Sequence, residues 1–310
     1  MKNKVILAHL AILIGNIIWG INNPITKSLV SVNISPYVLA YLRLIGACVL
    51  FWLASLFIPK EKVNTKDKIK IFFASIFGLV LNQILNTVGL SLTSPIDASI
   101  IVATLPIVTM ILAAIILKEP ITWLKFVGVL VGACGAILLI SNSQLKSNGT
   151  NSIVGNIIVF SAAISFGLYL TVFKAVVSRY NAITCMKWMF LFASIVSFPF
   201  SFRSVWDTNY ATMSGTTIMQ ICYVVIGATF VGYLLIQIAQ RHLRPTTLSM
   251  YNYLQPIIAS IVAVQMGLAS FGFEKVIASV LVFAGVYIVT QSKSKAQLDA
   301  AKKGDNYLAD

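Results

Sequence analysis

Ten predominantly apolar stretches follow one another along this chain, with only short connections between them. Each is close to the ~20 residues that an α-helix needs to cross the hydrocarbon core of a bilayer. The 310 residues are 58% hydrophobic and only 10% charged, whereas a soluble domain carries about 25% charged residues. We therefore predict an all-α integral membrane protein with ten transmembrane helices at residues 5–29, 36–58, 69–91, 95–117, 123–140, 152–174, 182–203, 218–240, 245–266 and 273–290.

An internal repeat relates the two halves of the chain. Residues 93–142 match residues 243–292 at a shift of 150 positions, which places Pro106 on Pro256 without a gap. Each half would hold five helices, an odd number, so the second copy would be inserted upside down relative to the first. The predicted organisation is two inverted five-helix repeats over 1–142 and 152–292, a linker over 143–151 and a cytosolic tail over 293–310.

The match extends into other helices of the repeat. Gly20–Lys27 aligns with Gly167–Lys174, and the 150-position shift places Gln83 on Tyr233. Substrate sites of duplicated transporters lie near the membrane midplane, between the halves. Polar residues of both copies are therefore candidates for one shared site.

Lys and Arg concentrate on one side of the expected membrane, for example at residues 60–70 and 293–303. Connections rich in these residues stay cytoplasmic. We predict a multi-pass protein of the plasma membrane, in a bacterial cell the inner membrane, with both termini cytoplasmic. The net charge of +14 is then a topology signal, and no nucleic-acid partner is expected. The expected partners are the lipid bilayer and a small-molecule substrate, with monomer and homodimer both left open.

Several residues of the first two helices resemble a known family. Trp19-Gly20, the asparagines Asn22 and Asn23, and Lys27 resemble the helix 1 signature of the EamA-type branch of the drug/metabolite transporter superfamily. Arg43, followed by small and apolar residues, resembles the second helix of that family. The resemblance implies a carrier of amino acids, other metabolites or drugs.

The end of the fourth helix carries the resemblance further. Pro106 followed by Leu117-Lys118-Glu119-Pro120 resembles the ending of that helix in the family, and the likeness covers about residues 5–292. In the second half, Gly267-Leu268-Ala269 stands where the family pattern has a glutamate. The role of the family glutamate therefore carries over to Glu119 alone.

Polar side chains inside apolar helices are candidates for a substrate site, because placing them in a bilayer is costly. The pairs Asn82/Asn86 and Tyr233/Gln237 are spaced i, i+4 and therefore share a helix face, and Tyr251/Gln255 has the same spacing. Hydrogen bonding between helices is the alternative interpretation of these stripes. The predicted substrate-binding residues are Trp19, Asn22, Asn23, Arg43, Asn82, Gln83, Asn86, Tyr169, Lys187, Tyr233, Gln237, Tyr251, Asn252 and Gln255.

Arg43, Lys187 and the helix-shaping residues have predicted roles of their own. Arg43 is expected to attract an anionic group of the solute, because its planar fork suits a carboxylate, and snorkelling to the interface is the alternative. For Lys187, snorkelling is the stronger interpretation. Pro24 is expected to bend the first helix beside a cavity. The residues predicted to shape helices or hinges are Pro24, Pro106, Glu119 and Pro256.

The sequence contains no arrangement typical of catalysis. It has no HExxH or P-loop motif and no pair of carboxylates at membrane depth, so no enzyme, metal site or cofactor is expected. The favoured function is a secondary transporter, a carrier or exporter, of a small organic metabolite such as an amino acid or organic acid, working by alternating access. The alternatives are a membrane receptor or tether without transport, and a drug-type efflux carrier.

Overall fold

The computed structural model describes residues 2–31, 34–93, 101–141, 153–208, 213–265 and 273–292, together with positions 98 and 210. The described part of the chain is helical and contains no strand. This confirms the predicted all-α class. A chain with this apolar composition satisfies its backbone in lipid by forming helices, because each helix makes its hydrogen bonds within itself.

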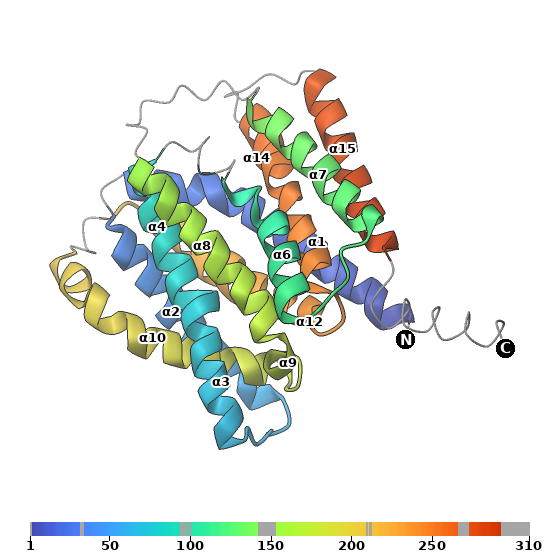
Figure 1. Cartoon of the computed structure of the whole chain (residues 1–310). Helices are drawn as coiled ribbons and strands as arrows, with labels where there is room; N and C mark the ends of the chain where they lie inside the picture. Colours follow the sequence, from blue (N-terminus) through green and yellow to red (C-terminus); the bar gives the residue numbers. More distant parts are fainter. Residues whose placement is uncertain are drawn as a thin grey trace.

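The helical segments follow the predicted order along both halves (Figure 1). In the first half they are α1 (Lys2–Ser31), α2 (Pro36–Ala54), η1 (Ser55–Phe57), α3 (Thr65–Ser75), the π-helical η2 (Ile76–Leu81), α4 (Asn82–Leu92), α6 (Leu105–Ile116) and α7 (Trp123–Ser141). In the second half they are α8 (Ile153–Val172), α9 (Lys174–Val177), α10 (Ala182–Asp207), α11 (Gly215–Cys222), the π-helical η4 (Tyr223–Val231), α12 (Gly232–Gln240), α13 (Pro245–Met250), η5 (Tyr251–Tyr253), α14 (Leu254–Gln265) and α15 (Phe273–Gln291).

Local sequence signals explain where several helices begin and end. The Asn64 side chain accepts a hydrogen bond from the Lys66 backbone N–H at 3.0 Å and caps α3, as expected for an N-cap asparagine. Pro36 stands at the start of α2, where its missing N–H costs nothing. After α6, Lys118 adopts a left-handed conformation with φ of 52°, and Pro120 cannot continue the helix.

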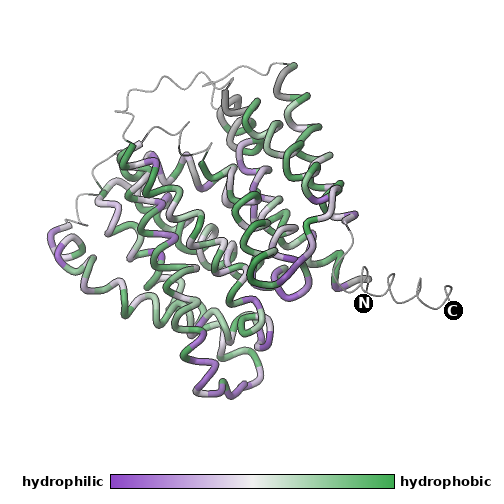
Figure 2. The backbone as a smooth tube through the Cα atoms, viewed as in Figure 1, coloured by the Kyte–Doolittle hydropathy of each residue, from purple (hydrophilic) through white to green (hydrophobic). Residues whose placement is uncertain are grey.

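Many of these helices can cross a membrane. In the part of the chain that the structure describes, six helices are long and apolar enough, at Lys4–Val30, Pro36–Phe57, Thr65–Leu92, Ile153–Val172, Ala182–Asp207 and Gly215–Gln240. Shorter apolar helices lie at Leu105–Ile116, Trp123–Leu138 and Val276–Gln291. Figure 2 shows hydrophobic residues along the helices, and the connection between α2 and α3 is one of the hydrophilic segments. The chain is a multi-pass membrane protein, while the count of ten helices stays a prediction.

The packing of one half recurs in the other. α4 packs along α8 in the same way that α12 packs along α1, and α6 contacts α8 as α14 contacts α1. Equivalent helices also pair directly, α2 with α10 and α7 with α15 (Figure 1). The π-helical segments match as well, because residues 76–81 fall on 226–231 under the 150-position shift. This arrangement fits the predicted two-repeat architecture.

Candidate substrate pocket

A pocket enclosing about 790 Å³, including its opening to solvent, is lined by both halves of the chain. Its walls come from α1, α2, α4, α6, α8, α12, η5 and α14. Nine of the fourteen predicted substrate-binding residues line it, namely Trp19, Asn22, Arg43, Asn82, Gln83, Asn86, Tyr233, Asn252 and Gln255. The structure therefore brings polar groups of both repeats together around one space.

Arg43 is the one cation among the residues that line the pocket. Its side chain lies on α2 with an exposed fraction of 8%. The Nε atom donates a hydrogen bond to Thr229 Oγ1 at 3.0 Å. Within the described residues no carboxylate forms an ion pair with Arg43. A guanidinium presents planar donors whose geometry matches a carboxylate or a phosphate.

The amides that line the pocket fall into two sets. Gln255 Nε2 donates to Asn16 Oδ1 at 3.0 Å and to Asn252 Oδ1 at 2.8 Å, and this network joins α1 to the region where η5 meets α14. By contrast, Asn22 Oδ1 is buried and has no hydrogen-bond partner in the described part of the chain. The buried Gln83 amide lies within reach of the Tyr233 hydroxyl but forms no well-aligned hydrogen bond with the described residues. A buried polar atom without a partner costs about 1–3 kcal/mol. These atoms are therefore the ones a bound solute could satisfy.

Trp19 forms the aromatic wall of the pocket. Its Nε1 donates to the Ala228 carbonyl at 2.8 Å, which belongs to the π-helical segment η4. Its ring meets those of Tyr233 and Phe166 edge-on, with centroid distances of 5.3 and 6.0 Å. A Cβ atom on Gly232 would lie 2.7 Å from Trp19 Nε1. The glycine at the start of α12 therefore makes room for the indole.

Tyr169 and Gln237 do not line the pocket, although both are predicted site residues. Tyr169 Oη donates to Gln237 Oε1 at 2.9 Å, and Gln237 Nε2 donates to the Val177 carbonyl at 2.6 Å. Both side chains are buried, with exposed fractions of 1% and 0%. They form a closed polar contact beside the pocket.

Tyr251 and Lys187 also lie outside the pocket. The Tyr251 hydroxyl pairs with His9 Nδ1 at 2.8 Å. Tyr251 belongs to the 3₁₀ segment η5, which has three residues per turn, so the i, i+4 spacing of Tyr251 and Gln255 does not by itself place them on one face. The Lys187 ammonium lies 5.0 Å from the Trp52 ring centroid, consistent with the snorkelling alternative. The side chain of Asn23 lies outside the described residues.

Two of the four residues predicted to shape helices stand at helix starts. Pro106 is the second residue of α6, directly after a turn, and Pro256 is the third residue of α14, directly after η5. The repeat therefore has a break in the same place in both copies. Pro24 lies inside α1, which remains helical on both sides of it.

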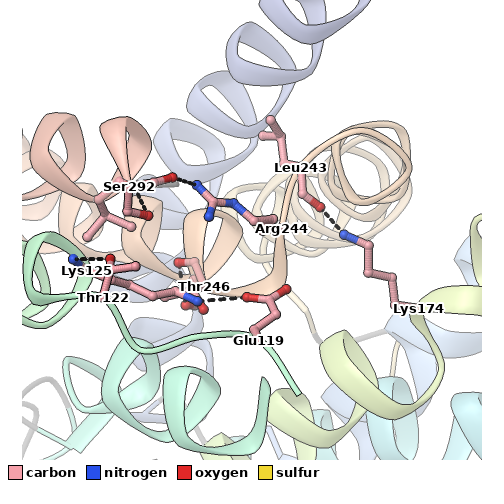
Figure 3. A network of polar contacts seen from close by, with 10 residues as sticks. Glu119, Thr122, Lys125, Lys174, Leu243, Arg244, Thr246 and Ser292 are labelled. Carbon is pink, nitrogen blue, oxygen red and sulfur yellow. Dashed lines mark hydrogen bonds and ion pairs between the residues drawn. The ribbon is translucent and has the colours of Figure 1, made fainter. Parts of the chain in front are cut away.

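Glu119 belongs to a polar network at another place in the molecule (Figure 3). Its Oε2 pairs with Lys125 Nζ at 2.7 Å, and Lys125 is only 2% exposed. Nearby, Lys174 Nζ donates to the Leu243 carbonyl, and Arg244 Nη2 donates to the Ser292 carbonyl at 2.8 Å. The network joins the connection after α6 to α7, α9, the connection before α13 and the end of α15.

Burial changes the acidity of Lys174 in this network. Desolvation lowers the pKa of its ammonium from 10.5 to about 8; nearby Glu119 raises this pKa, while Arg244 lowers it. The sequence did not single out Lys174 or Arg244 as site residues. Their positions at helix ends made them resemble ordinary cytoplasmic charges.

Several lining residues were also missed. Thr26 and Thr87 line the pocket, and each lies four residues after a predicted site residue, Asn22 and Gln83. Extending the i, i+4 stripe by one turn would have found both. The apolar lining residues have no such signal, because the same residue types face lipid elsewhere; they are Leu90, Val102, Leu105, Val159, Ala163 and Phe166.

Comparison with known proteins gives consistent matches over most of the chain. The family model described as the EamA-like transporter family matches residues 6–141 and 153–291. An uncharacterized transporter of Archaeoglobus fulgidus is 28% identical over 84% of this chain and 90% of its own length. The uncharacterized transporter YvbV of Bacillus subtilis is 25% identical over 97% and 95%, and a WAT1-related protein of Arabidopsis thaliana is 24% identical over 95% and 87%.

A solved crystal structure is among those with a similar fold. It covers 93% of this chain and 97% of its own, with a TM-score of 0.73 at 16% sequence identity. Taken with the family match, these similarities support a membrane transporter role, and none of them indicates a catalytic family.

Proposed function

Because the chain belongs to the EamA-like transporter family, within the drug/metabolite transporter superfamily, we propose that it is a secondary transporter of a small organic metabolite that carries a carboxylate or similar anionic group. Amino acids and organic acids are the favoured classes. The carrier would work by alternating access between the two inverted repeats, without a cofactor and without chemical conversion of the solute.

The observation that carries this proposal is the environment of Arg43. The guanidinium lines the pocket, and no carboxylate among the described residues neutralises it. A solute anion would supply the missing charge through charge-assisted hydrogen bonds, which are roughly twice as strong as neutral ones. The amides of Asn22 and Gln83 would bind other polar atoms of the solute, and Trp19 would cover its apolar part.

The helix breaks support the proposed mechanism. The pocket is bordered by the start of α6 and by the junction of η5 and α14. Discontinuous helices at the interface between repeats are a recurring feature of transporter sites. We place the carrier in the plasma membrane with both termini cytoplasmic, as a monomer or homodimer.

Solute flux in proteoliposomes tests the proposal directly. The chain should carry radiolabelled amino acids or organic acids, and it should carry their amide analogues, which lack the carboxylate charge, at least about tenfold more slowly, which corresponds to 1.4 kcal/mol. Transport of cationic dyes with no transport of any carboxylate would instead identify a drug-type carrier. Absence of flux for both classes would leave the receptor alternative.

Cysteine labelling tests the orientation separately. In a cysteine-free background, Lys66→Cys should react with an impermeant maleimide only from the cytoplasmic side, and Lys146→Cys only from the opposite side. Equal reaction of both positions in intact cells would contradict the inverted arrangement of the halves.

A further inference from the structure

Lys27 and Lys174 show that the repeat in the sequence is also an equivalence in space. They occupy the same position of the repeat. Lys27 Nζ donates to the Leu90 carbonyl near the end of α4 at 3.2 Å. Lys174 Nζ donates to the Leu243 carbonyl shortly after the end of α12. Since α4 and α12 are equivalent helices, each lysine ties its own helix to the region where the equivalent helix of its half ends, although Leu243 lies three residues beyond Gln240, the counterpart of Leu90.

The same alignment identifies a counterpart in the second repeat for each of three residues on one wall of the pocket. In the first repeat, α1 and α4 contribute Asn22, Thr87 and Leu90 to this wall. The alignment of Gly20–Lys27 and the 150-position shift give their counterparts in the second repeat. These counterparts are Tyr169 on α8 and Gln237 and Gln240 on α12.

The counterpart residues form a buried polar face. Tyr169, Gln237 and Gln240 have exposed fractions of 1%, 0% and 0%. The hydrogen bond of 2.9 Å from Tyr169 Oη to Gln237 Oε1 joins α8 to α12 across this face. Neither amide atom of Gln240 has a hydrogen-bond partner in the described part of the chain. An apolar residue would avoid this cost of about 1–3 kcal/mol, so the amide is explained if water or solute reaches it in another conformation.

We propose that this face between α8 and α12, made of Tyr169, Gln237 and Gln240, is the cytoplasmic half of the transport pathway and is closed in this structure. The inference rests on the proposed function and adds a second set of solute-contacting residues to it. If the two repeats exchanged conformations, Asn22 and Thr87 would pack against each other. The solute would then contact Tyr169 and Gln237 instead.

The polar network of Figure 3 includes Lys174, which would hold the cytoplasmic half closed. Lys174 lies shortly after the end of α8, and its ammonium donates a hydrogen bond to the Leu243 carbonyl after α12. Glu119, which is paired with Lys125, adds a carboxylate to this cationic region. The repeat position of Glu119 is Ala269 in the sequence. The second repeat therefore has no carboxylate at the position equivalent to Glu119. We expect this asymmetry to favour the conformation with the cytoplasmic half closed.

Cysteine accessibility in inside-out membrane vesicles tests the inference. Cys48, Cys134, Cys185 and Cys222 are replaced by serine, Gln240→Cys is introduced, and a sulfonated, impermeant maleimide is applied to the exposed cytoplasmic side. Ala239→Cys is the matched control, because Ala239 is the adjacent residue, is 0% exposed and packs in the apolar core. Gln237→Cys provides a second position on the same face.

We expect positions 240 and 237 to react at least about tenfold faster than position 239, since reaction follows the population of the open form. Glu119→Gln should increase the rate further at 240 and 237 but not at 239. Equal and slow reaction at all three positions, with and without Glu119→Gln, would overturn the inference. Solute flux is measured on each variant: flux without labelling rejects only this pathway, whereas absence of flux in the cysteine-free chain rejects the proposed function.

Discussion

Arg43 Nε and Thr229 Oγ1 lie 3.0 Å apart, and this hydrogen bond joins α2 to the π-helical segment η4 of the other repeat. The Thr229 hydroxyl in turn donates to the Val224 carbonyl at 2.7 Å. The hydroxyl therefore accepts from the guanidinium and donates to the backbone, which fixes its position beside Arg43. An irregular stretch of helix thus orients the one cation among the residues that line the pocket.

Replacing Arg43 should separate charged from uncharged solutes. Hydrogen bonds to charged groups contribute about 1.5–3 kcal/mol, so Arg43→Ala should lower the initial rate of carboxylate transport by roughly 10- to 100-fold. Arg43→Lys keeps the charge but loses the planar fork and should lower it less. Flux in proteoliposomes at solute concentrations below KM measures both effects.

The amide analogue, which lacks the carboxylate charge, is the control for Arg43. Its slow transport should change little in Arg43→Ala, because no anion pairs with the guanidinium. If Arg43→Ala inserts normally and carries the carboxylate at the wild-type rate, Arg43 is a structural cation. Thr229→Val should produce a milder loss than Arg43→Ala, since it removes only the group that orients Arg43.

Gln83 should show opposite effects on stability and transport. Its buried amide lies within reach of the Tyr233 hydroxyl but forms no well-aligned hydrogen bond with the described residues, so Gln83→Leu should stabilise the protein by up to about 1–3 kcal/mol and raise Tm in detergent. The same substitution should raise KM by about tenfold if the amide binds the solute. Higher stability with unchanged transport kinetics would show that Gln83 does not contact the solute.

Asn16→Leu is the matched control for this substitution. Asn16 Nδ2 donates to the Ile12 carbonyl at 2.9 Å, and its Oδ1 accepts from Gln255. Because both of its amide atoms are satisfied, the substitution leaves a buried donor of Gln255 with one partner fewer. Asn16→Leu should therefore lower Tm, in contrast to Gln83→Leu.

The polar lining residues could be predicted from the sequence because an amide or guanidinium at membrane depth is costly. Such a residue is therefore a candidate for a functional site. Asn82 and Asn86 were found by their i, i+4 spacing, and both line the pocket. Tyr251 does not line the pocket although Gln255 does, and its 3₁₀ segment does not keep the α-helical period on which the prediction relied. Nothing in the residue pattern signalled that change of pitch.

The sequence could not distinguish which half of the pathway is open. Asn22 and Tyr169 occupy the same position of the repeat, and the residue pattern makes both of them candidates. Only Asn22 lines the pocket, since Tyr169 is closed against Gln237. That difference is a property of one conformation, which a periodic pattern of residues does not encode. The family match likewise supports the transporter role without naming a solute.

Gly232 should be intolerant of even one added methyl group. A Cβ there would lie 2.7 Å from Trp19 Nε1, so Gly232→Ala must displace the indole and weaken its bond to the Ala228 carbonyl. Overpacking of this kind costs about 1–3 kcal/mol, and both Tm and transport should fall. Gly215→Ala is the control, because nothing lies within 4 Å of its added Cβ, and it should behave like wild type. Wild-type transport by Gly232→Ala would mean that the position of Trp19 does not shape the site.

Lys174 should make transport depend on pH. In this structure burial lowers the pKa of its ammonium from the ordinary 10.5 to about 8, with Glu119 raising it and Arg244 lowering it. If the cytoplasmic half opens, water reaches Lys174 and its pKa returns toward 10.5. Below pH 8 the side chain is charged in both forms, and above pH 10.5 it is neutral in both. Between these values, opening takes up a proton, so raising the pH favours the closed form by up to about tenfold per pH unit.

Transport of a simple carboxylate should therefore fall as the pH on the cytoplasmic side rises from 8 toward 10. The carboxylate itself does not titrate in this range, since carboxyl groups have pKa values of about 4. Lys174→Arg is the decisive variant, because a guanidinium stays charged throughout this range. Its transport should be independent of pH over this window, while Lys125→Arg, which alters the partner of Glu119 but leaves Lys174 in place, should retain the wild-type dependence. An unchanged pH profile in Lys174→Arg would assign the titration to another group and separate Lys174 from the opening of the pathway.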